Sequence, residues 1–274
     1  SLKGIHPNFL EQIKQHLDPN IDIQQIFEKV SKSVPPNTNR FWTIDPIDGT
    51  SGFKNYTEDP QSPNQYAIAV ALIENNDVIF SAVAWPGQTP YFSGLQKPEP
   101  TFFLAARNIG SFYTTQSIFD ASGDFTLPGE NHSGFIRVTL PSNPVPRQTH
   151  HESRNSETVA KMKEIAKGFG MEYNVLDCTS MVKGFCLALG TASYYVRVPY
   201  GEPEAIYDIA PFSMFIEEAG GFATTGDGRK LVFDHNGRVV GTDTGVVFSN
   251  RGAVFHEKLV DIYCKAFGFQ KAQK

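Results

Sequence analysis

Residues 40–53 read Arg-Phe-Trp-Thr-Ile-Asp-Pro-Ile-Asp-Gly-Thr-Ser-Gly-Phe, and they are the most informative stretch of the chain. The aromatic and β-branched run Phe41 to Ile44 predicts a buried strand that ends at Asp45-Pro46. Proline fixes its own φ and favours an extended residue before it, and Asp48-Gly49 then predicts a turn. A turn without chemistry is the alternative, but the whole string at the end of a strand favours a functional site.

The two aspartates of this stretch suit a hard cation. Asp45 and Asp48 lie three residues apart on a stiff turn, so their carboxylates can converge, and the Ile47 carbonyl is a natural third oxygen. Oxygen-only ligation is typical of Mg²⁺, which keeps several waters and takes other ligands from phosphate. The backbone N–H groups of Gly49 and Thr50 are placed to bind a phosphate oxygen. The stretch therefore predicts a Mg²⁺ and phosphate site.

The same string resembles a family signature. Residues 45–50, Asp-Pro-Ile-Asp-Gly-Thr, are similar to the motif of the lithium-sensitive, Mg²⁺-dependent phosphatases, which include inositol monophosphatases, fructose-1,6-bisphosphatases and 3′(2′),5′-bisphosphate nucleotidases. Residues 207–221 resemble the family's Trp-Asp-x-Ala-Ala-Gly helix and its Glu-Ala-Gly-Gly end. Tyr207 replaces Trp there, and Pro211 and Phe212 stand where the family has small residues. The resemblance covers nearly the whole chain from residue 40 onward.

The resemblance implies an α+β fold, the layered αβαβα sandwich of the sugar-phosphatase (inositol monophosphatase-like) type. The order of expected elements is compatible with it: an antiparallel half at residues 1–140 carries the metal motif, and an α/β half at residues 141–274 carries Asp208. Hydrophobic periodicity predicts short helices at 9–17 and 23–30 and a loop at 121–133. It predicts a hairpin of strands 66–73 and 78–85, strands 101–106, 111–114, 135–140, 173–176, 194–198 and 246–249, and helices 157–169, 181–189, 206–219 and 253–267.

Asp208 is the third expected metal ligand. It lies in the first turn of a predicted helix, where an acid can also be a helix-dipole partner worth about 0.3–1 kcal/mol. By resemblance, Asp208 shares a second Mg²⁺ with Asp48, and Thr50 orients the water that attacks the phosphoryl group. The implied chemistry is metal-assisted hydrolysis of a phosphoric monoester, with Asp48 and Thr50 as catalytic residues.

A second set of residues resembles the bisphosphate nucleotidases. Gly52-Phe53 follows the first motif as in that subfamily, although Ser51 replaces its Lys. Ser180, Lys183 and Arg197 match positions that the nucleotidases use around the nucleotide and its uncleaved 5′-phosphate, for which a fixed pair of cations is suited. A helix with one solvated Lys and a strand with an exposed Arg is the alternative. Two extra residues, 178–179, precede Ser180 and make the contacts to the base less secure.

One expected feature is missing from residues 1–39. Family members carry a Gly-Glu-Glu segment, whose Glu bridges the metals, and an earlier Asp that acts on the attacking water; residues 1–39 contain no Glu-Glu pair and no such Asp-rich segment. We therefore expect an N-terminally truncated chain, a segment supplied by another chain, or a relative that cannot assemble the full metal cluster. Loss of a metal ligand should lower Mg²⁺ affinity by more than the 10–100-fold typical of its supporting residues.

Composition sets the remaining limits. The 274 residues suffice for a sizeable core, and a net charge of −5 gives no sign of a nucleic-acid partner. No apolar run reaches the roughly 18 residues of a membrane span, and the three cysteines, Cys178, Cys186 and Cys264, form no zinc spacing and are expected as reduced core thiols. We expect a cytoplasmic protein whose partner is a small phosphorylated nucleotide.

Three functions follow as hypotheses. The first is Mg²⁺-dependent hydrolysis of the 3′-phosphate of adenosine 3′,5′-bisphosphate or its sulfated relative, a reaction of sulfur metabolism that is lithium-sensitive in this family. The second is a catalytically impaired relative that binds a nucleotide or a partner protein, which the missing acids favour. The third is an inositol phosphate phosphatase, against which Gly52-Phe53, Ser180, Lys183 and Arg197 argue.

Overall fold

The computed structural model describes residues 38–56, 64–86, 99–122, 134–140, 148–150, 156–177, 179–199 and 201–273. The chain divides into Ser1–Thr38 and Asn39–Lys274, and all the elements described below belong to the second unit. The helices expected at 9–17 and 23–30, residues 123–133 of the expected loop, and Cys178 lie outside the described residues.

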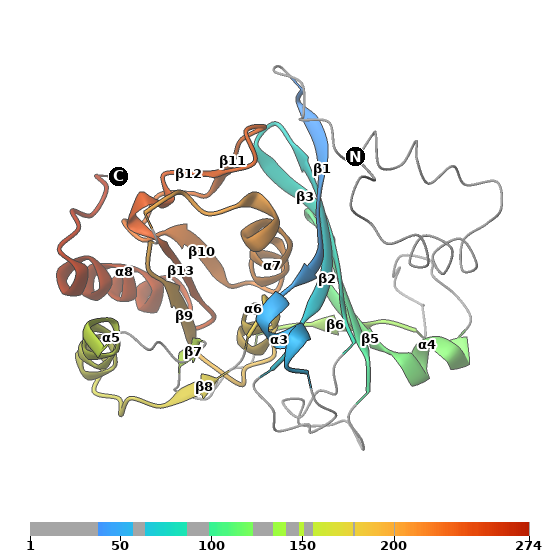
Figure 1. Cartoon of the computed structure of the whole chain (residues 1–274), viewed down its shortest axis with the longest axis horizontal. Coiled ribbons are helices and arrows are strands. Elements are labelled where there is room, and N and C mark those ends of the chain that lie inside the picture. The colour runs from blue at the N-terminus through green and yellow to red at the C-terminus, as the bar shows by residue number, and fades with distance from the viewer. Residues whose placement is uncertain are drawn as a thin grey trace. The chain divides into compact units, whose positions relative to one another are not determined.

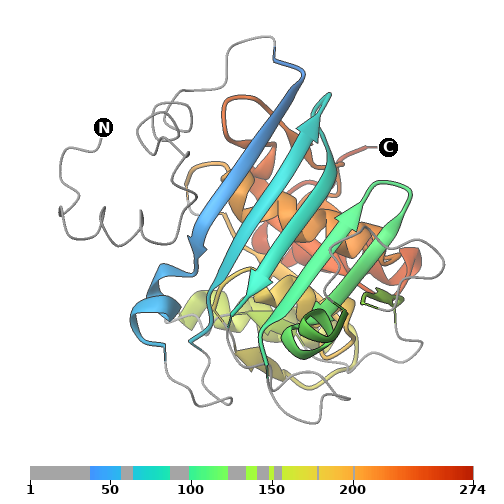
Figure 2. The ribbon, with the colours of Figure 1, turned by 90° about the vertical axis from the view of Figure 1, so that its right-hand side faces the viewer.

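An antiparallel sheet of six strands, in the order β1-β2-β3-β4-β5-β6, forms the first half of this unit. Figure 2 looks onto it, with helices behind. Asn75 and Asn76, with φ of 50° and 65°, close the β2–β3 hairpin as a two-residue turn of the kind that fits the strand twist, so the predicted hairpin is confirmed. The strands are β1 (Arg40–Asp48), β2 (Ala67–Glu74), β3 (Asp77–Trp85), β4 (Thr101–Ala106), β5 (Gly110–Thr115) and β6 (Ile136–Val138).

Strand β1 is more exposed than predicted. Among the described strands it lies at the edge of its sheet, where it pairs with β2. Trp42 and Ile44 are 55% and 47% exposed, whereas alternate residues such as Phe41 are half-buried. The apolar run therefore makes a half-exposed edge strand, and the prediction of a buried strand was wrong because composition alone does not show which face of a strand is covered.

A second sheet of five strands has the order β10-β13-β9-β7-β8. Strand β7 runs parallel to β8 and β9, whereas β13 is antiparallel to both of its neighbours, β10 and β9. The strands are β7 (Gln148–His150), β8 (Val175–Asp177), β9 (Tyr194–Arg197), β10 (Phe222–Thr225) and β13 (Val246–Ser249), with a separate ribbon of β11 (Val232–Phe233) and β12 (Val239–Val240).

Helices α6 and α7 lie between the two sheets, and α5 and α8 cover the far face of the second sheet (Figure 1). The described residues thus form β–α–β–α layers of the expected sandwich. The helices are α3 (Thr50–Lys54), α4 (Gln116–Ser122), α5 (Ser156–Gly168), α6 (Val182–Ala188), α7 (Ile206–Glu218) and α8 (Ala253–Phe267), with a 3₁₀ turn η1 (Thr242–Thr244). The α+β class is confirmed; the division into halves 1–140 and 141–274 stays a prediction.

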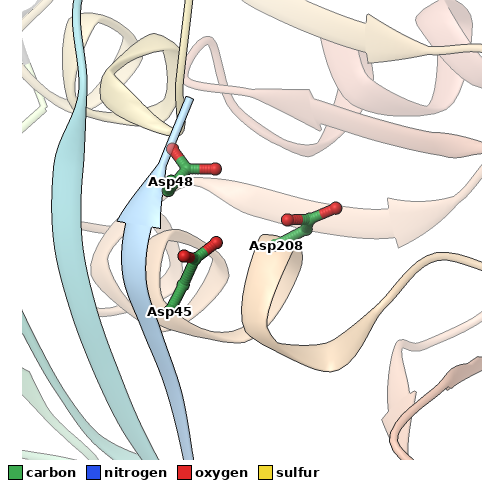
Figure 3. Close-up of side chains that lie close together, drawn as sticks. All are labelled: Asp45, Asp48 and Asp208. Carbon is green, nitrogen blue, oxygen red and sulfur yellow. The ribbon is translucent and has the colours of Figure 1, made fainter. Parts of the chain in front are cut away.

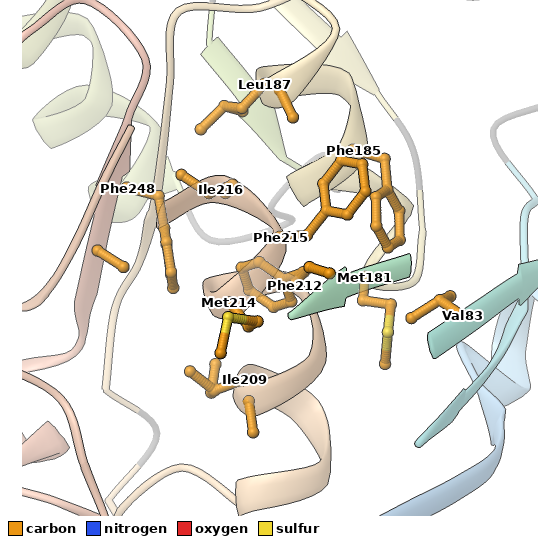
Figure 4. Packing of buried hydrophobic residues seen from close by; sticks show 14 of the residues in the cluster. Val83, Met181, Phe185, Leu187, Ile209, Phe212, Met214, Phe215, Ile216 and Phe248 are labelled. Carbon is orange, nitrogen blue, oxygen red and sulfur yellow. The ribbon is translucent and has the colours of Figure 1, made fainter. Parts of the chain in front are cut away.

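The core between the sheets is built from aromatic rings on the central helices. Phe103 of β4 stacks on Phe185 of α6 with ring centroids 3.9 Å apart, and Phe215 of α7 meets both rings edge-on. Figure 4 shows Phe185, Phe212 and Phe215 packed together. Each such buried ring contributes about 1.5–3 kcal/mol relative to an exposed one, so this cluster fixes α7 against the first sheet.

Two further expectations concern membrane-spanning segments and the cysteines. None of the helices in the described ranges is long and apolar enough to cross a membrane. Cys186 and Cys264 are both buried, as predicted for core cysteines.

Candidate active site

Three carboxylates from two distant parts of the chain meet in one place. Asp45 and Asp48 come from the end of β1, and Asp208 from the first turn of α7. One oxygen from each lies within 4.8 Å of the others, and Figure 3 shows the three side chains around a common space. Asp208 follows Asp48 by 160 positions, and the packing of α7 against the first sheet brings the two together.

A bulge between Asp45 and Asp48 puts these two aspartates on the same side. Residues three apart on a regular strand point to opposite faces. Here Asp45 pairs with Ala69 and Asp48 with Ala67, so three steps on β1 match two on β2 and the alternation is reset. Proline is suited to a bulge because it has no N–H for the ladder. The Ile47 N–H donates to Asp45 Oδ1 at 3.0 Å and holds that carboxylate.

Asp48 is fixed from the other half of the unit. The Ser180 hydroxyl and the Met181 backbone N–H both donate to Asp48 Oδ2. Gly49 makes this approach possible, because a Cβ there would lie 2.8 Å from the Ser180 Cβ. Gly49 also has φ of 80° and caps α3, a conformation that favours glycine.

Asp208 is held by a partly buried ion-pair network. Arg197 Nη2 donates to Asp208 Oδ2 at 3.2 Å and lies 2.8 Å from Glu204 Oε2. Glu204 is only 5% exposed, so a charged residue that the sequence analysis did not single out belongs to the surroundings of the site. The available signal was weak: an acid four residues before Asp208, at the entry to an apolar helix.

The electrostatics of the cluster favour a cation. Burial, followed by the negative charge of Asp48, raises the pKa of Asp45 to about 6. Burial also raises the pKa of Asp208, although the positive charge of Arg197 opposes that rise. Carboxylates crowded in this way repel one another, and a divalent cation would relieve the repulsion.

The donor set fits Mg²⁺. The oxygens are carboxylates, and in the described residues no His or Cys joins this cluster, which is the ligand choice of hard cations and not of zinc. The cluster opens into a cavity of about 410 Å³, large enough for a phosphate and waters. Its walls are Ile44, Asp45, Pro46, Ile47, Asp48, Gly49, Thr50, Tyr207 and Asp208.

The other expected residues lie as follows. Ile47, Gly49 and Thr50 line the cavity, and the Thr50 hydroxyl donates weakly to the Ile47 carbonyl at 3.4 Å. Ser180 touches Asp48, and Arg197 touches Asp208. Lys183 Nζ lies 5.7 Å from the centre of the Tyr195 ring, and its positive charge acts on Asp208. The roles of all these residues stay predictions.

With this geometry, comparison with known proteins places the chain in a class. The model of the inositol monophosphatase family matches residues 6–266. The chain therefore belongs to the inositol monophosphatase family. The match begins further toward the N-terminus than residue 40, where the sequence analysis had placed the start of the resemblance.

The chain is similar to bisphosphate nucleotidases in sequence and to a solved phosphatase in structure. The chain is 29% identical over 226 residues to a 3′(2′),5′-bisphosphate nucleotidase of Oryza sativa, and 30% identical over 225 residues to one of Schizosaccharomyces pombe. These matches cover 80% and 81% of the chain, and the chain spans 58% of the length of each relative. Among solved structures, an IMPase/NADP phosphatase complexed with Mg²⁺ and phosphate matches with a TM-score of 0.55 and 19% identity, covering 92% of this chain and 82% of that one, which supports the fold.

Proposed function

We propose that the protein is a Mg²⁺-dependent phosphoric monoester hydrolase that removes the 3′-phosphate of adenosine 3′,5′-bisphosphate or of its sulfated relative. The observation that carries the proposal is the convergence of Asp45, Asp48 and Asp208 on one cavity. The bisphosphate nucleotidases among its relatives, at 29% and 30% identity, support the choice of substrate.

Asp45, Asp48 and Asp208 would hold the cation, with the Ile47 carbonyl as a further oxygen. Bound there, Mg²⁺ would supply Lewis-acid polarisation of the phosphoryl group and a lowered pKa for water. The chain's own contribution is positional. Ser180 and Met181 fix one oxygen of Asp48, and the Ile47 N–H fixes one oxygen of Asp45. The carboxylates are thus oriented before any ligand arrives, which saves the cost of ordering them.

The phosphate end of the substrate would meet the first turn of α3. Gly49 caps this helix, and Thr50 begins it, at the wall of the cavity. Their backbone N–H groups suit phosphate oxygens, and the Thr50 hydroxyl can hold and orient a water beside Asp48. Lys183 and Arg197, on the α6 and β9 side of Asp208, supply the positive charge for a second phosphate.

The test is phosphate release from adenosine 3′,5′-bisphosphate with Mg²⁺, compared with inositol 1-phosphate. We expect turnover of the nucleotide, inhibition by lithium, and loss of turnover in Asp48→Asn. Asp243→Asn is the matched control, because this side chain is 75% exposed and does not line the cavity. Equal turnover of both substrates would favour the inositol phosphate phosphatase.

The second candidate is a relative that binds a nucleotide without cleaving it. It is favoured by the number of acids in the cluster, which is three in the described part of the chain. Stabilisation by adenosine 3′,5′-bisphosphate in a thermal melt, without phosphate release, would select this candidate. Cytoplasmic localisation stays a prediction.

A further inference from the structure

Glu204 is an acidic residue whose burial costs free energy. It is 5% exposed, and burial raises the pKa of its carboxyl group while the positive charge of Arg197 opposes the rise. Removing an ionised carboxylate from water costs several kcal/mol, which a single ion pair often fails to recover. A buried acid beside a candidate active site therefore calls for a functional explanation.

The backbone of Glu204 is held on both sides. Its N–H donates to the Thr242 hydroxyl at 2.8 Å, and its carbonyl accepts from the Val239 N–H at 2.8 Å. The Thr242 hydroxyl in turn donates to the Val239 carbonyl at 2.9 Å, which closes a small network. The preceding residue is held too, because Arg238 donates to the Pro203 carbonyl at 3.0 Å. These hydrogen bonds hold the backbone from which the Glu204 side chain extends.

Arg197 uses one nitrogen, Nη2, for both of its acidic partners. It lies 2.8 Å from Glu204 Oε2 and 3.2 Å from Asp208 Oδ2. Asp208 also belongs to the cluster that would hold a cation, and a carboxylate that binds a cation interacts less strongly with an arginine. Once Asp208 is engaged in this way, Glu204 is the carboxylate that remains to hold Arg197 in place.

We infer that Glu204 is a positioning residue that anchors Arg197 beside the acidic cluster, so that its guanidinium group can meet an anionic group of the substrate. Nη2 is committed to the carboxylates, and the other nitrogens of the guanidinium fork carry the N–H groups that suit a phosphate. The identity of that anion, the 5′-phosphate, rests on the proposed function. The anchoring of Arg197 by Glu204 does not depend on the proposed function.

The experiment compares Glu204→Gln with Glu202→Gln. The first substitution keeps the size of the side chain and removes its charge, and the second does the same to a side chain that is 77% exposed and paired with Arg238. Each variant is assayed on adenosine 3′,5′-bisphosphate and on adenosine 3′-monophosphate, which lacks the 5′-phosphate. For Glu204→Gln we expect KM for the bisphosphate to rise about 10-fold, with little change in kcat and little change for the monophosphate, since a charge-assisted hydrogen bond is worth about this much.

Two results would overturn the anchoring role. One is an equal effect of Glu204→Gln on both substrates, or none on either, while Glu202→Gln behaves like the wild type. The other is a crystal structure of Glu204→Gln, or of Glu204→Ala, in which the Arg197 guanidinium keeps its position. The crystal structure tests the anchoring even if the protein has no activity. Absence of phosphate release from the wild-type protein would refute the proposed function. A displaced Arg197 in the variant would still support the anchoring by Glu204.

Discussion

Ser180 and Asp48, 132 residues apart, are joined by a hydrogen bond from the Ser180 hydroxyl to Asp48 Oδ2, and the neighbouring Met181 N–H donates to the same oxygen. Ser180 has φ of 69°, a left-handed conformation that is uncommon for serine. The backbone strain at Ser180 thus coincides with the contact that orients Asp48. This arrangement gives the two oxygens of Asp48 different surroundings, with Oδ2 held by the protein.

Ser180→Ala should weaken cation binding without unfolding the protein. It removes one of the two donors that fix Asp48 Oδ2, and loss of a group that orients a metal ligand typically costs 10–100-fold in affinity. We expect Mg²⁺ affinity, measured by titration calorimetry at pH 7.5, to fall about 10-fold.

Ser213→Ala is the control for this substitution. Its hydroxyl donates at 3.0 Å to the Ala210 carbonyl of the same helix, α7, and it has no contact with Asp48. Unchanged Mg²⁺ affinity in Ser180→Ala would show that Met181 alone suffices, and would leave Ser180 to the nucleotide contact that the sequence predicts.

Gly49→Ala should be more damaging than another glycine substitution with the same backbone conformation. An alanine at φ of 80° costs about 1–2 kcal/mol anywhere, and here its Cβ would also lie 2.8 Å from the Ser180 Cβ. Gly237 has φ of 78°, and a Cβ added there would meet open space, with nothing beyond its chain neighbours within 4 Å. In urea denaturation we expect Gly237→Ala to lose about 1 kcal/mol and Gly49→Ala at least about twice as much.

Gly49→Ala and Gly237→Ala should also differ in their affinity for Mg²⁺. Gly49→Ala would push Ser180 away from Asp48, so its affinity should fall with that of Ser180→Ala, whereas Gly237→Ala should keep the wild-type value. Equal behaviour of the two glycine variants in both measurements would contradict the close approach at Gly49.

Local pattern predicted those parts of the fold in which neighbours in sequence are neighbours in space. The β2–β3 hairpin and α7 both followed from hydrophobic periodicity. Short strands such as β10 and β11 were missed, because two to four residues carry too little periodicity and depend on pairing for their stability.

The site was predictable to the extent that it lies on motifs. Asp45 and Asp48 could be paired from sequence, but the reason that they face the same way is the bulge against Ala67 and Ala69, which needs the strand register. Glu204 was missed because its partner Arg197 lies on another element. Pairing between elements has no local signal, so the contact of Ser180 with Asp48 and the contact of Glu204 with Arg197 emerged only from the structure.

Gly184 and Phe212 should be energetically coupled. Phe212 departs from the small residues of the family, and a Cβ on Gly184 would lie 2.5 Å from the Phe212 ring. Although alanine is the better helix former by about 1 kcal/mol, Gly184→Ala should therefore destabilise the protein by about 1–3 kcal/mol through overpacking. Phe212→Ala should cost about 3–5 kcal/mol through the cavity that it leaves.

A double-mutant cycle in urea checks this coupling. If the glycine makes room for the ring, the double variant should be more stable than the sum of the single effects predicts, by about 1 kcal/mol or more. Strict additivity would mean that α6 moves away from α7 to accommodate the new methyl group.

Asp45→Asn should stabilise the protein when no cation is bound. Burial and the charge of Asp48 raise the pKa of Asp45 from 3.8 to about 6, so the folded protein binds this proton more tightly than the unfolded chain does. Stability therefore falls as pH rises from about 4 to about 6, and the loss is complete above that range. Asparagine removes the penalty. In EDTA at pH 7.5 we expect a gain of about 1 kcal/mol, a value reduced for solvent screening because the side chain is only partly buried.

Mg²⁺ should make the wild type more stable than Asp45→Asn, the reverse of the order expected in EDTA. A ligand that binds only the folded state stabilises it by an amount that grows with concentration over Kd, and Asp45→Asn loses a charged ligand. Thermal melts at pH 7.5, with EDTA or with Mg²⁺, should thus show the variant above the wild type in the first condition and below it in the second. At pH 4 in EDTA the two should nearly coincide, and Asp243→Asn should follow the wild type throughout. A wild type that is the more stable protein in EDTA at pH 7.5 would mean that Asp45 is satisfied by the protein itself, and that the cluster does not depend on a cation to relieve its charge.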